Sequence, residues 1–306
     1  MESLIPGSLD DLLRGARTSG RSPNWPLASP PKGGDGLADL PTVEAVLDAI
    51  AEGRVHPEKV FFIDATSEYV DAKRFLRAEP DAALDGAGVR RFFEVEGGSL
   101  LLAGVQDCFP AVGALTSALS GALLAQANTN LYLTPGGAQT FPRHWDTHDV
   151  VVLQLEGRKR WTIYEPLLEA PLHRHHACRT AELREMTPRW GEIEMQPGGA
   201  LYIPRGYLHE ATAVEGPSLH ISTGIHRITW HRLVEVMVAD ALRECAEDLT
   251  FRGDCPAGGA HLAATVREGI APRVEALVKR LREIDAAEVL QSLTEPADGP
   301  TDEEES

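Results

Sequence analysis

Two stretches in the first half of the chain carry apolar residues at every third or fourth position, the spacing of one buried helix face. They cover residues 42–52, where Gly53 follows as a stop signal, and residues 109–127. A shorter pattern predicts a third helix over residues 70–77. Between these segments, residues 60–63 form a compact apolar run that is typical of a buried strand.

From Asn130 onward the pattern changes to short β-type runs separated by glycine and proline. The runs expected to be strands cover residues 131–133, 150–155, 160–164, 200–203, 210–214 and 219–225. Several short strands with this punctuation favour an antiparallel sandwich or barrel. Helical spacing returns after Trp230 and again over residues 274–284, so we expect a helical region near the end of the chain.

The charge of the chain limits its partners. With 46 acidic and 29 basic residues, the formal net charge is −17. Residues 295–306 are acidic, carry almost no apolar side chains and are expected to be disordered. The rest of the chain is still acidic, so we expect no direct nucleic-acid binding and favour a basic protein or peptide as partner.

Cysteine use and hydropathy indicate the compartment. The four cysteines are far apart and form no Cys-x-x-Cys pair, which fits a reducing compartment. No apolar run approaches the roughly 18 residues of a membrane span. The first residues also lack a basic segment followed by an apolar one. We therefore expect a cytoplasmic protein that does not associate with membranes.

The candidate chemistry centres on the segment Phe-Pro-Arg-His-Trp-Asp, in which His144 and Asp146 are two residues apart. On a strand, residues at this spacing point to the same side. His209, from a later strand, is the candidate third ligand. Two histidines and one carboxylate suit Fe(II), because they leave open positions for a co-substrate and O₂. Taken alone, the His-x-Asp tripeptide is common by chance, and a single histidine is usually structural.

Two stretches resemble one known family. They are NLYLTPGGAQTFPRHWDTHDVVVLQLEGRKRWTIYEP, which begins at Asn130, and PGGALYIPRGYLHEATAVEGPSLHISTG, which contains His209. Both resemble the ribosomal oxygenases, JmjC-type members of the cupin superfamily that depend on Fe(II) and 2-oxoglutarate. The resemblance implies an α+β fold in which a double-stranded β-helix (the cupin or JmjC jelly roll) has N-terminal helices before it and a C-terminal helical region after it.

The same resemblance implies a domain plan. An N-terminal lead-in covers residues 1–95 and a JmjC/cupin catalytic core covers residues 96–228. A helical region over residues 229–294 is expected to form a homodimer, because an amphipathic helix pair needs something to cover its apolar face. The acidic tail is residues 295–306.

The resemblance also assigns roles to residues. The implied iron ligands are His144, Asp146 and His209. Lys159 is implied to meet the distal carboxylate of 2-oxoglutarate, and a buried dianion beside a metal does need a fixed cation. On a strand Lys159 shares a face with Trp161, which is the inward face if the tryptophan is buried. The alternative is a lysine in a surface turn, with Arg158 and Arg160 as competing cations.

Four further residues match positions that hold the co-substrate in the family. Asn130 and Tyr132 are two apart and share a face, although Tyr132 is equally suited to simple core packing. Ser222 keeps the family's small hydroxyl residue. His220 stands where the family usually has threonine, so the local co-substrate contacts are in doubt there, and His220 is a candidate for bonding behind the site or for touching substrate.

The other histidines have weaker claims. One cluster is His173, His175, His176 and Cys178, which lies between arginines and reads as a solvated loop near the mouth of the site. His148 follows His144 by four residues, but the β pattern after it argues against a helical pair of ligands. Trp145 is expected to point away from the metal and to pack.

The implied activity is hydroxylation of an arginine or histidine side chain of a basic protein such as a ribosomal protein. The cofactors are Fe(II), 2-oxoglutarate and O₂. One alternative is the same chemistry on a small molecule or a biosynthetic peptide. A second, from a different class, is a cupin that binds metal without catalysis, which would leave Lys159 idle.

Overall fold

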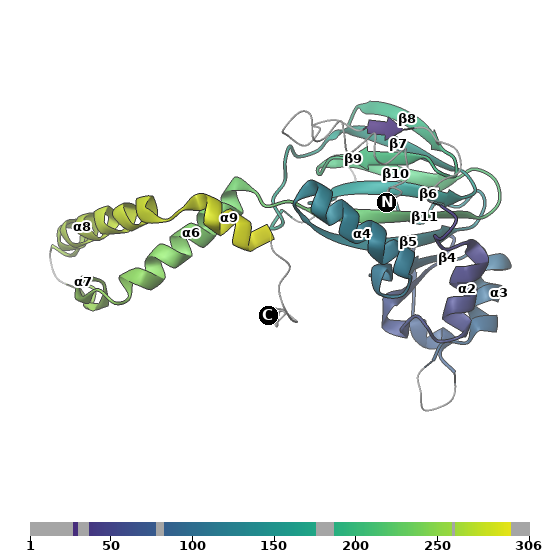
Figure 1. Cartoon of the computed structure of the whole chain (residues 1–306), viewed down its shortest axis with the longest axis horizontal. Helices are drawn as coiled ribbons and strands as arrows, with labels where there is room; N and C mark the ends of the chain where they lie inside the picture. Colours follow the sequence, from purple (N-terminus) through teal and green to yellow (C-terminus); the bar gives the residue numbers. More distant parts are fainter. Residues whose placement is uncertain (1–26, 30–36, 78–82, 176–186, 259–260, 295–306) are drawn as a thin grey trace. The chain divides into compact units, whose positions relative to one another are not determined.

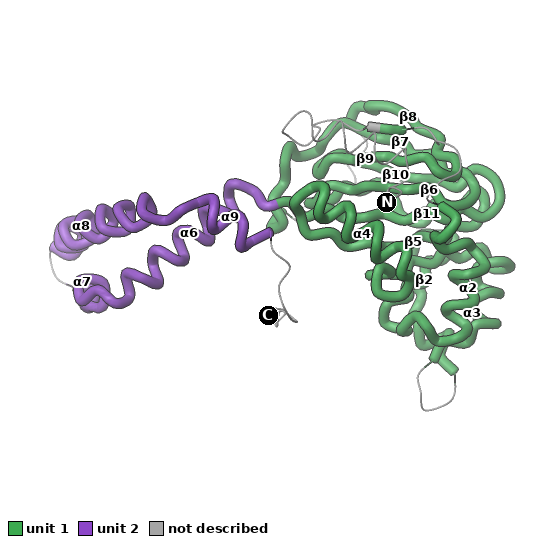
Figure 2. Tube along the Cα trace, viewed as in Figure 1, with its two compact units in different colours: residues 1–227 green, residues 228–306 purple. Residues whose placement is uncertain are grey.

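The computed structural model describes residues 27–29, 37–77, 83–175, 187–258 and 261–294. The chain divides into two compact units, residues 1–227 and residues 228–306 (Figure 2). The finer boundary expected at residue 95 stays a prediction. The acidic tail and most of the segment before residue 37 lie outside the described residues.

The first unit is built on two antiparallel sheets (Figure 1). The larger has the strand order β1-β9-β6-β11-β5-β4-β2-β3. Its strands are β1 (Leu27–Ser29), β2 (Val60–Ile63), β3 (Tyr69–Val70), β4 (Ser99–Leu102), β5 (Gln126–Thr134), β6 (Asp149–Glu156), β9 (Ala200–Ile203) and β11 (Ser218–His226). The smaller sheet has the order β10-β7-β8, with β7 (Lys159–Pro166), β8 (Arg189–Met195) and β10 (Tyr207–Ala213).

Strand β6 shows how the sequence produces this layering. Val150 and Val152 belong to a core shared with the small sheet, where they join Trp161. Val151 and Leu153 face the opposite way, into the larger core on the helical side of the sheet. Because both faces of the strand are buried, its sequence is an almost continuous apolar run rather than an alternating one.

Helices cover the outer face of the large sheet. They are α2 (Val43–Ala51), α3 (Gly86–Glu94) and α4 (Pro110–Leu123), with short 3₁₀ turns η1 (Pro57–Lys59), η2 (Ala72–Phe75) and η3 (Val105–Asp107). Helix α4 lies along β5 (Figure 1), and its residues Val112, Leu115 and Leu119 are buried in the larger core. The helix spacing seen in the sequence is the spacing of this buried face.

Several expected elements are confirmed and others are wrong. The helix expected over residues 70–77 is instead the end of β3 followed by η2. The helix expected over 109–127 ends at Leu123, because Leu124 adopts a left-handed conformation (φ 48°) and the chain then enters β5. Strand β8 was missed, because it lies at the edge of the small sheet and most of its side chains are not buried.

The second unit is helical. It contains α6 (Trp230–Cys245), α7 (Leu249–Arg252), α8 (Leu262–Glu283) and α9 (Ala286–Thr294), and α6 packs against both α8 and α9. The two stretches of helical spacing expected after Trp230 lie in α6 and mainly in α8. Among the described residues, no helix combines the length and apolar character needed to cross a membrane.

Candidate functional site

A pocket of about 200 Å³ lies between the two sheets of the first unit. Its walls come from β5 and β11 of the large sheet, from β7 and β10 of the small sheet, and from the loop before β6. All eight residues singled out in the sequence line it: Asn130, Tyr132, His144, Asp146, Lys159, His209, His220 and Ser222. The fold therefore gathers residues that are up to 92 positions apart in the chain.

The candidate metal ligands form a tight group. One ligand atom from each of His144, Asp146 and His209 lies within 4.8 Å of the other two. The backbones of His144 and His209 pair directly, with hydrogen bonds of 3.0 and 2.8 Å in the two directions. The His209 Nε2 and the Asp146 Oδ2 are 3.6 Å apart. Elsewhere in the described ranges, no other group of three such side chains gathers in this way.

Hydrogen bonds fix which imidazole nitrogen faces the pocket. The Nδ1 of His144 lies 2.9 Å from the carbonyl oxygen of Pro142, and the Nδ1 of His209 lies 3.1 Å from that of Tyr207. A carbonyl oxygen only accepts, so each Nδ1 donates its hydrogen. In the neutral imidazole the Nε2 then carries the lone pair, which is the form that binds a metal ion.

The charges of the group suit a cation. Burial and the neighbouring His144 lower the pKa of His209 to about 4, so this imidazole is neutral at physiological pH. Burial alone would raise the pKa of Asp146, but the surrounding imidazoles, led by His209, hold it below its ordinary value. A neutral His209 beside an ionised Asp146 is the combination of protonation states that metal binding requires.

One local expectation about these ligands is wrong. His144 and Asp146 do not lie on a regular strand: residues 141–148 form a loop in which His144 makes an isolated bridge to His209. Proline at position 142 favours this interruption, since it has no N–H to donate to a ladder. Trp145 is buried and packs against Tyr164 and Leu208, as the sequence analysis expected.

Lys159 lies inside the pocket wall and not in a surface turn. It is the first residue of β7, is 2% exposed, and shares the buried face of the strand with Trp161. Its Nζ donates to the Thr134 hydroxyl at 2.9 Å. Among the described residues no carboxylate lies within ion-pair distance of it, and burial lowers its pKa to about 7. A buried amine without a counter-charge is a binding position for an anion.

The four other expected residues form two cross-strand pairs between β5 and β11. His220 lies opposite Tyr132, and Ser222 lies opposite Asn130. The rings of Tyr132 and His220 stack, with centroids 4.8 Å apart and planes 6° from parallel. The side-chain oxygen of Asn130 accepts from the backbone N–H of Gly104 at 3.1 Å, which holds that amide in place.

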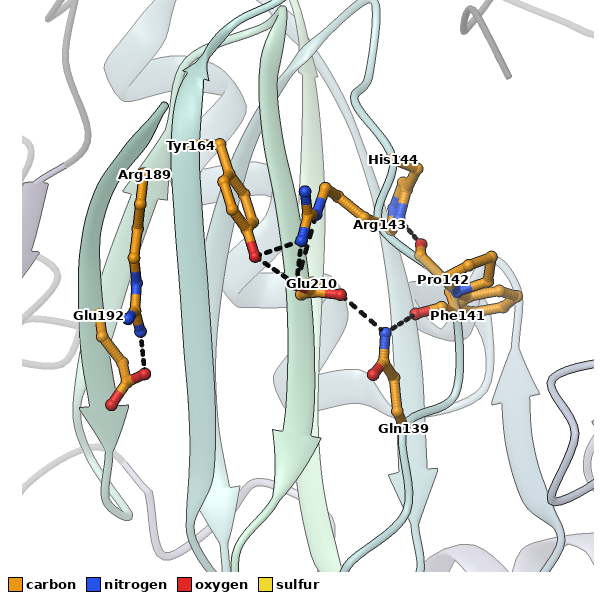
Figure 3. Close-up of polar contacts among 9 residues, drawn as sticks. All are labelled: Gln139, Phe141, Pro142, Arg143, His144, Tyr164, Arg189, Glu192 and Glu210. Carbon is orange, nitrogen blue, oxygen red and sulfur yellow. Dashed lines mark hydrogen bonds and ion pairs between the residues drawn. The ribbon is translucent and has the colours of Figure 1, made fainter. Parts of the chain in front are cut away.

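Sequence reasoning missed a polar network on the other side of the ligand-bearing segments (Figure 3). Glu210 accepts from the Tyr164 hydroxyl at 2.5 Å, from Arg143 at 3.1 Å and from Gln139 at 3.2 Å. The Arg143 guanidinium also lies over the Tyr164 ring, 3.7 Å from its centroid. Arg143 precedes His144 and Glu210 follows His209, so this pair ties the two ligand segments together from behind.

Two further histidines line the pocket. The rings of His148 and His226 are 4.8 Å apart. In the separate cluster, His173 is exposed and the Nδ1 of His175 accepts from the backbone N–H of Leu172. His176 and Cys178 lie outside the described residues.

The segment that contains most of these residues is similar to known proteins. Residues 114–233 match the family model of the JmjC domain. The chain is 29% identical over 209 residues to a bifunctional lysine-specific demethylase and histidyl-hydroxylase NO66 of Culex quinquefasciatus, covering 67% of this chain and 32% of the relative. It is 32% identical over 196 residues to ribosomal oxygenase 1 of Rattus norvegicus, covering 62% and 32%. The chain therefore spans about a third of the length of these curated relatives.

Solved structures agree on the fold. A structure of the Escherichia coli ribosomal oxygenase YcfD is similar at a TM-score of 0.58 and 17% identity, covering 91% of this chain and 70% of that one. A YcfD structure in complex with cobalt and 2-oxoglutarate has a TM-score of 0.57 at 17% identity, with the same coverage. Residues 114–233 thus match the JmjC domain, the fold is the expected jelly roll with flanking helices, and the resemblance to ribosomal oxygenases is confirmed.

Proposed function

We propose that this protein is an Fe(II)- and 2-oxoglutarate-dependent oxygenase that hydroxylates a side chain of a basic protein. The proposal rests on one observation: a single pocket holds both the three-residue donor group and a buried Lys159 that has no carboxylate partner among the described residues. A metal-binding cupin without catalysis needs the first feature but has no use for the second.

His144, Asp146 and His209 would hold the iron, and their chemistry fits it. Two neutral imidazoles and one carboxylate are a mixed nitrogen and oxygen donor set that suits Fe(II) and leaves positions free. The backbone carbonyls of Pro142 and Tyr207 orient the two rings. When bound, iron and 2-oxoglutarate supply the oxidation, in which O₂ gives one oxygen atom to the substrate C–H and one to succinate, with release of CO₂.

Lys159 would bind the distal carboxylate of 2-oxoglutarate. Its ammonium is held by Thr134 and lies in the wall shared by β5, β7 and β11. Trp161, beside it on β7, has a buried indole N–H with no hydrogen-bond partner in the described part of the chain, which is a further unsatisfied donor in this wall. Asn130, Tyr132 and Ser222 complete the polar surface around the co-substrate in this proposal.

The proposed substrate is an arginine or histidine side chain of a ribosomal or other basic protein. Support comes from the names of the relatives, which include a histidyl-hydroxylase and ribosomal oxygenases, and from the formal charge of −17. A long-range acidic field attracts a basic chain. Hydroxylation of a small molecule or a biosynthetic peptide is the alternative, for which the same pocket and cofactors serve.

Two further features are proposed with the activity. We place the protein in the cytoplasm, and we propose a homodimer formed through the second unit. Helix α8 carries exposed apolar residues at every fourth position, namely Val266, Ile270, Val274 and Val278. Such a stripe is stabilised when another helix covers it.

Anaerobic thermal unfolding with Mn(II) in place of iron tests the proposed function. Mn(II) is expected to raise the midpoint and 2-oxoglutarate to raise it further, because each binds only the folded state. Asp146→Ala should lose the metal effect and Lys159→Met should lose only the 2-oxoglutarate effect, whereas the exposed Lys73→Met should behave as the wild type.

To find the substrate, the enzyme is then incubated with basic ribosomal-protein peptides. Turnover is measured as release of succinate and as a 16 Da increase in peptide mass, which is the mass of one oxygen atom. A metal effect without any response to 2-oxoglutarate would favour the non-catalytic cupin. A response to 2-oxoglutarate without turnover of any basic peptide would favour the small-molecule alternative.

A further inference from the structure

Two groups that can carry a positive charge lie side by side in the wall of the pocket. The Nζ of Lys159 is 3.5 Å from the Nδ1 of His220, and each residue is 2% exposed. Two adjacent positive charges are unfavourable in a buried position. Burial and the charge of Lys159 accordingly lower the pKa of His220 well below its usual range, so the imidazole is neutral.

The hydrogen-bond partners of the lysine can be counted. Thr140 donates to Ser99 at 3.2 Å, so the 2.8 Å contact between Thr134 and Thr140 has Thr134 as donor. The Thr134 oxygen is then free to accept from Lys159. A protonated lysine has three N–H groups. One goes to Thr134, a second goes to the Nδ1 of His220, and a third remains for the pocket that both residues line.

His220 is held rigidly in this arrangement. Its ring stacks on Tyr132 and meets the edge of Trp161, with centroids 5.5 Å apart and planes at 85°. On β11 its backbone lies between Tyr132 of β5 and Gln154 of β6. The Nδ1 acceptor therefore stays beside the lysine, which a flexible side chain would not guarantee.

From these contacts we infer that His220 is a positioning residue: it accepts a hydrogen bond from Lys159 and directs the remaining N–H toward the co-substrate, whose binding to the buried lysine takes up a proton near neutral pH. The inference rests on the proposed function, because it needs a carboxylate at this position. Without an anion the lysine is only partly protonated near neutral pH, because its burial without a carboxylate partner lowers its pKa to about 7. A bound carboxylate stabilises the ammonium form.

The other ionisable groups around Lys159 and His220 do not account for this proton uptake. Tyr132 on β5 is neutral, because burial raises its pKa further above the physiological range. Gln154 on β6 and Thr134 on β5 do not titrate. His144, Asp146 and His209 lie on the metal side of the pocket, and with Mn(II) bound they are held deprotonated.

Isothermal titration calorimetry of the Mn(II)-loaded full chain with 2-oxoglutarate measures the proton directly. Titrations at pH 7 in two buffers of different ionisation enthalpy should give an uptake of a fraction of a proton per ligand, from the partly protonated lysine. The affinity of the wild type should fall by about tenfold per pH unit between pH 7.5 and 8.5, as the free lysine loses its proton.

Two substitutions isolate His220. His220→Leu should weaken 2-oxoglutarate binding by about tenfold, from the loss of one hydrogen bond to a charged group. It should also increase the proton uptake at pH 7, because the ammonium form of Lys159 loses its acceptor. His220→Asn offers an amide oxygen in place of Nδ1 and should restore both the affinity and the uptake to near the wild-type values. In turnover assays the change should lie in the KM for 2-oxoglutarate and not in kcat.

The outcomes separate this inference from the proposed function. If 2-oxoglutarate does not bind the Mn(II)-loaded wild type at all, the proposed function fails. If it binds without proton uptake and with an affinity independent of pH, the lysine is permanently charged and the inference is wrong. The inference also fails if His220→Leu binds with wild-type affinity and uptake. If Mn(II) does not stabilise His220→Leu, that variant is not correctly folded. The pH series of the wild type and the affinity of His220→Asn then test the inference.

Discussion

Lys159→Met is expected to stabilise the protein while it removes the co-substrate site. Burial lowers the pKa of Lys159 from 10.5 to about 7. In the unfolded chain the lysine is fully protonated at pH 7, so folding must either bury the charge or release the proton. At about 1.4 kcal/mol per pKa unit, this costs the folded state about 4 kcal/mol at pH 7.

The substitution recovers most of this free energy. Methionine has a similar length, carries no charge and packs well in irregular apolar space. It leaves the Thr134 hydroxyl and the Nδ1 of His220 with one hydrogen bond fewer each, at a combined cost of about 1 to 2 kcal/mol. The free energy of unfolding at pH 7 should therefore rise by about 2 to 3 kcal/mol, which is large against the total stability of a domain.

The effect has a definite pH dependence. The folded-state pKa lies below the unfolded-state value, so the unfolded chain binds more protons between about pH 7 and 10.5. The stability of the wild type relative to Lys159→Met should rise across this window. Urea denaturation of the metal-free protein at pH 7 and pH 9 measures the difference, with the exposed Lys73→Met as control.

A Lys159→Met variant that is less stable than the wild type at pH 7 would refute this reasoning, because Lys159 would then have a favourable partner in the folded state. A gain in stability that keeps 2-oxoglutarate binding would instead refute the assignment of the lysine to the co-substrate.

The remaining predictions concern the ligand segments and the second unit. Glu210→Ala should weaken Mn(II) binding by about tenfold and lower stability by about 2 kcal/mol, because it frees Arg143 and Tyr164 behind the ligands. The control Glu194→Ala loses only exposed ion pairs on β8, so its Mn(II) affinity should be unchanged. If Glu210→Ala binds Mn(II) as tightly as the wild type, Glu210 does not position the ligands. The double substitution Ile270→Asp and Val274→Asp on α8 should give a monomer by light scattering, and a wild type that is already monomeric at micromolar concentration would rule out the dimer.

Much of this protein follows from the sequence by itself. The continuous apolar run of β6 predicts that both of its faces are buried. Lys159 is two residues before Trp161 on the same strand, so it shares the buried face of the tryptophan. The donor types, together with the family resemblance of the segments around them, predicted the metal site. These features are local, since the period of a helix or strand decides which side chains share a buried face.

The tertiary structure decided what those side chains meet. The stacking of His220 on Tyr132 depends on the register between β11 and β5, and the pairing of Arg143 with Glu210 joins segments 67 residues apart. His144 lies in a loop, and a single bridge to the distant His209 holds it beside β10. Such contacts come from the packing of one distant segment against another. Periodicity along the chain tells which face of a strand a residue occupies, but it does not identify the strand that lies beside it.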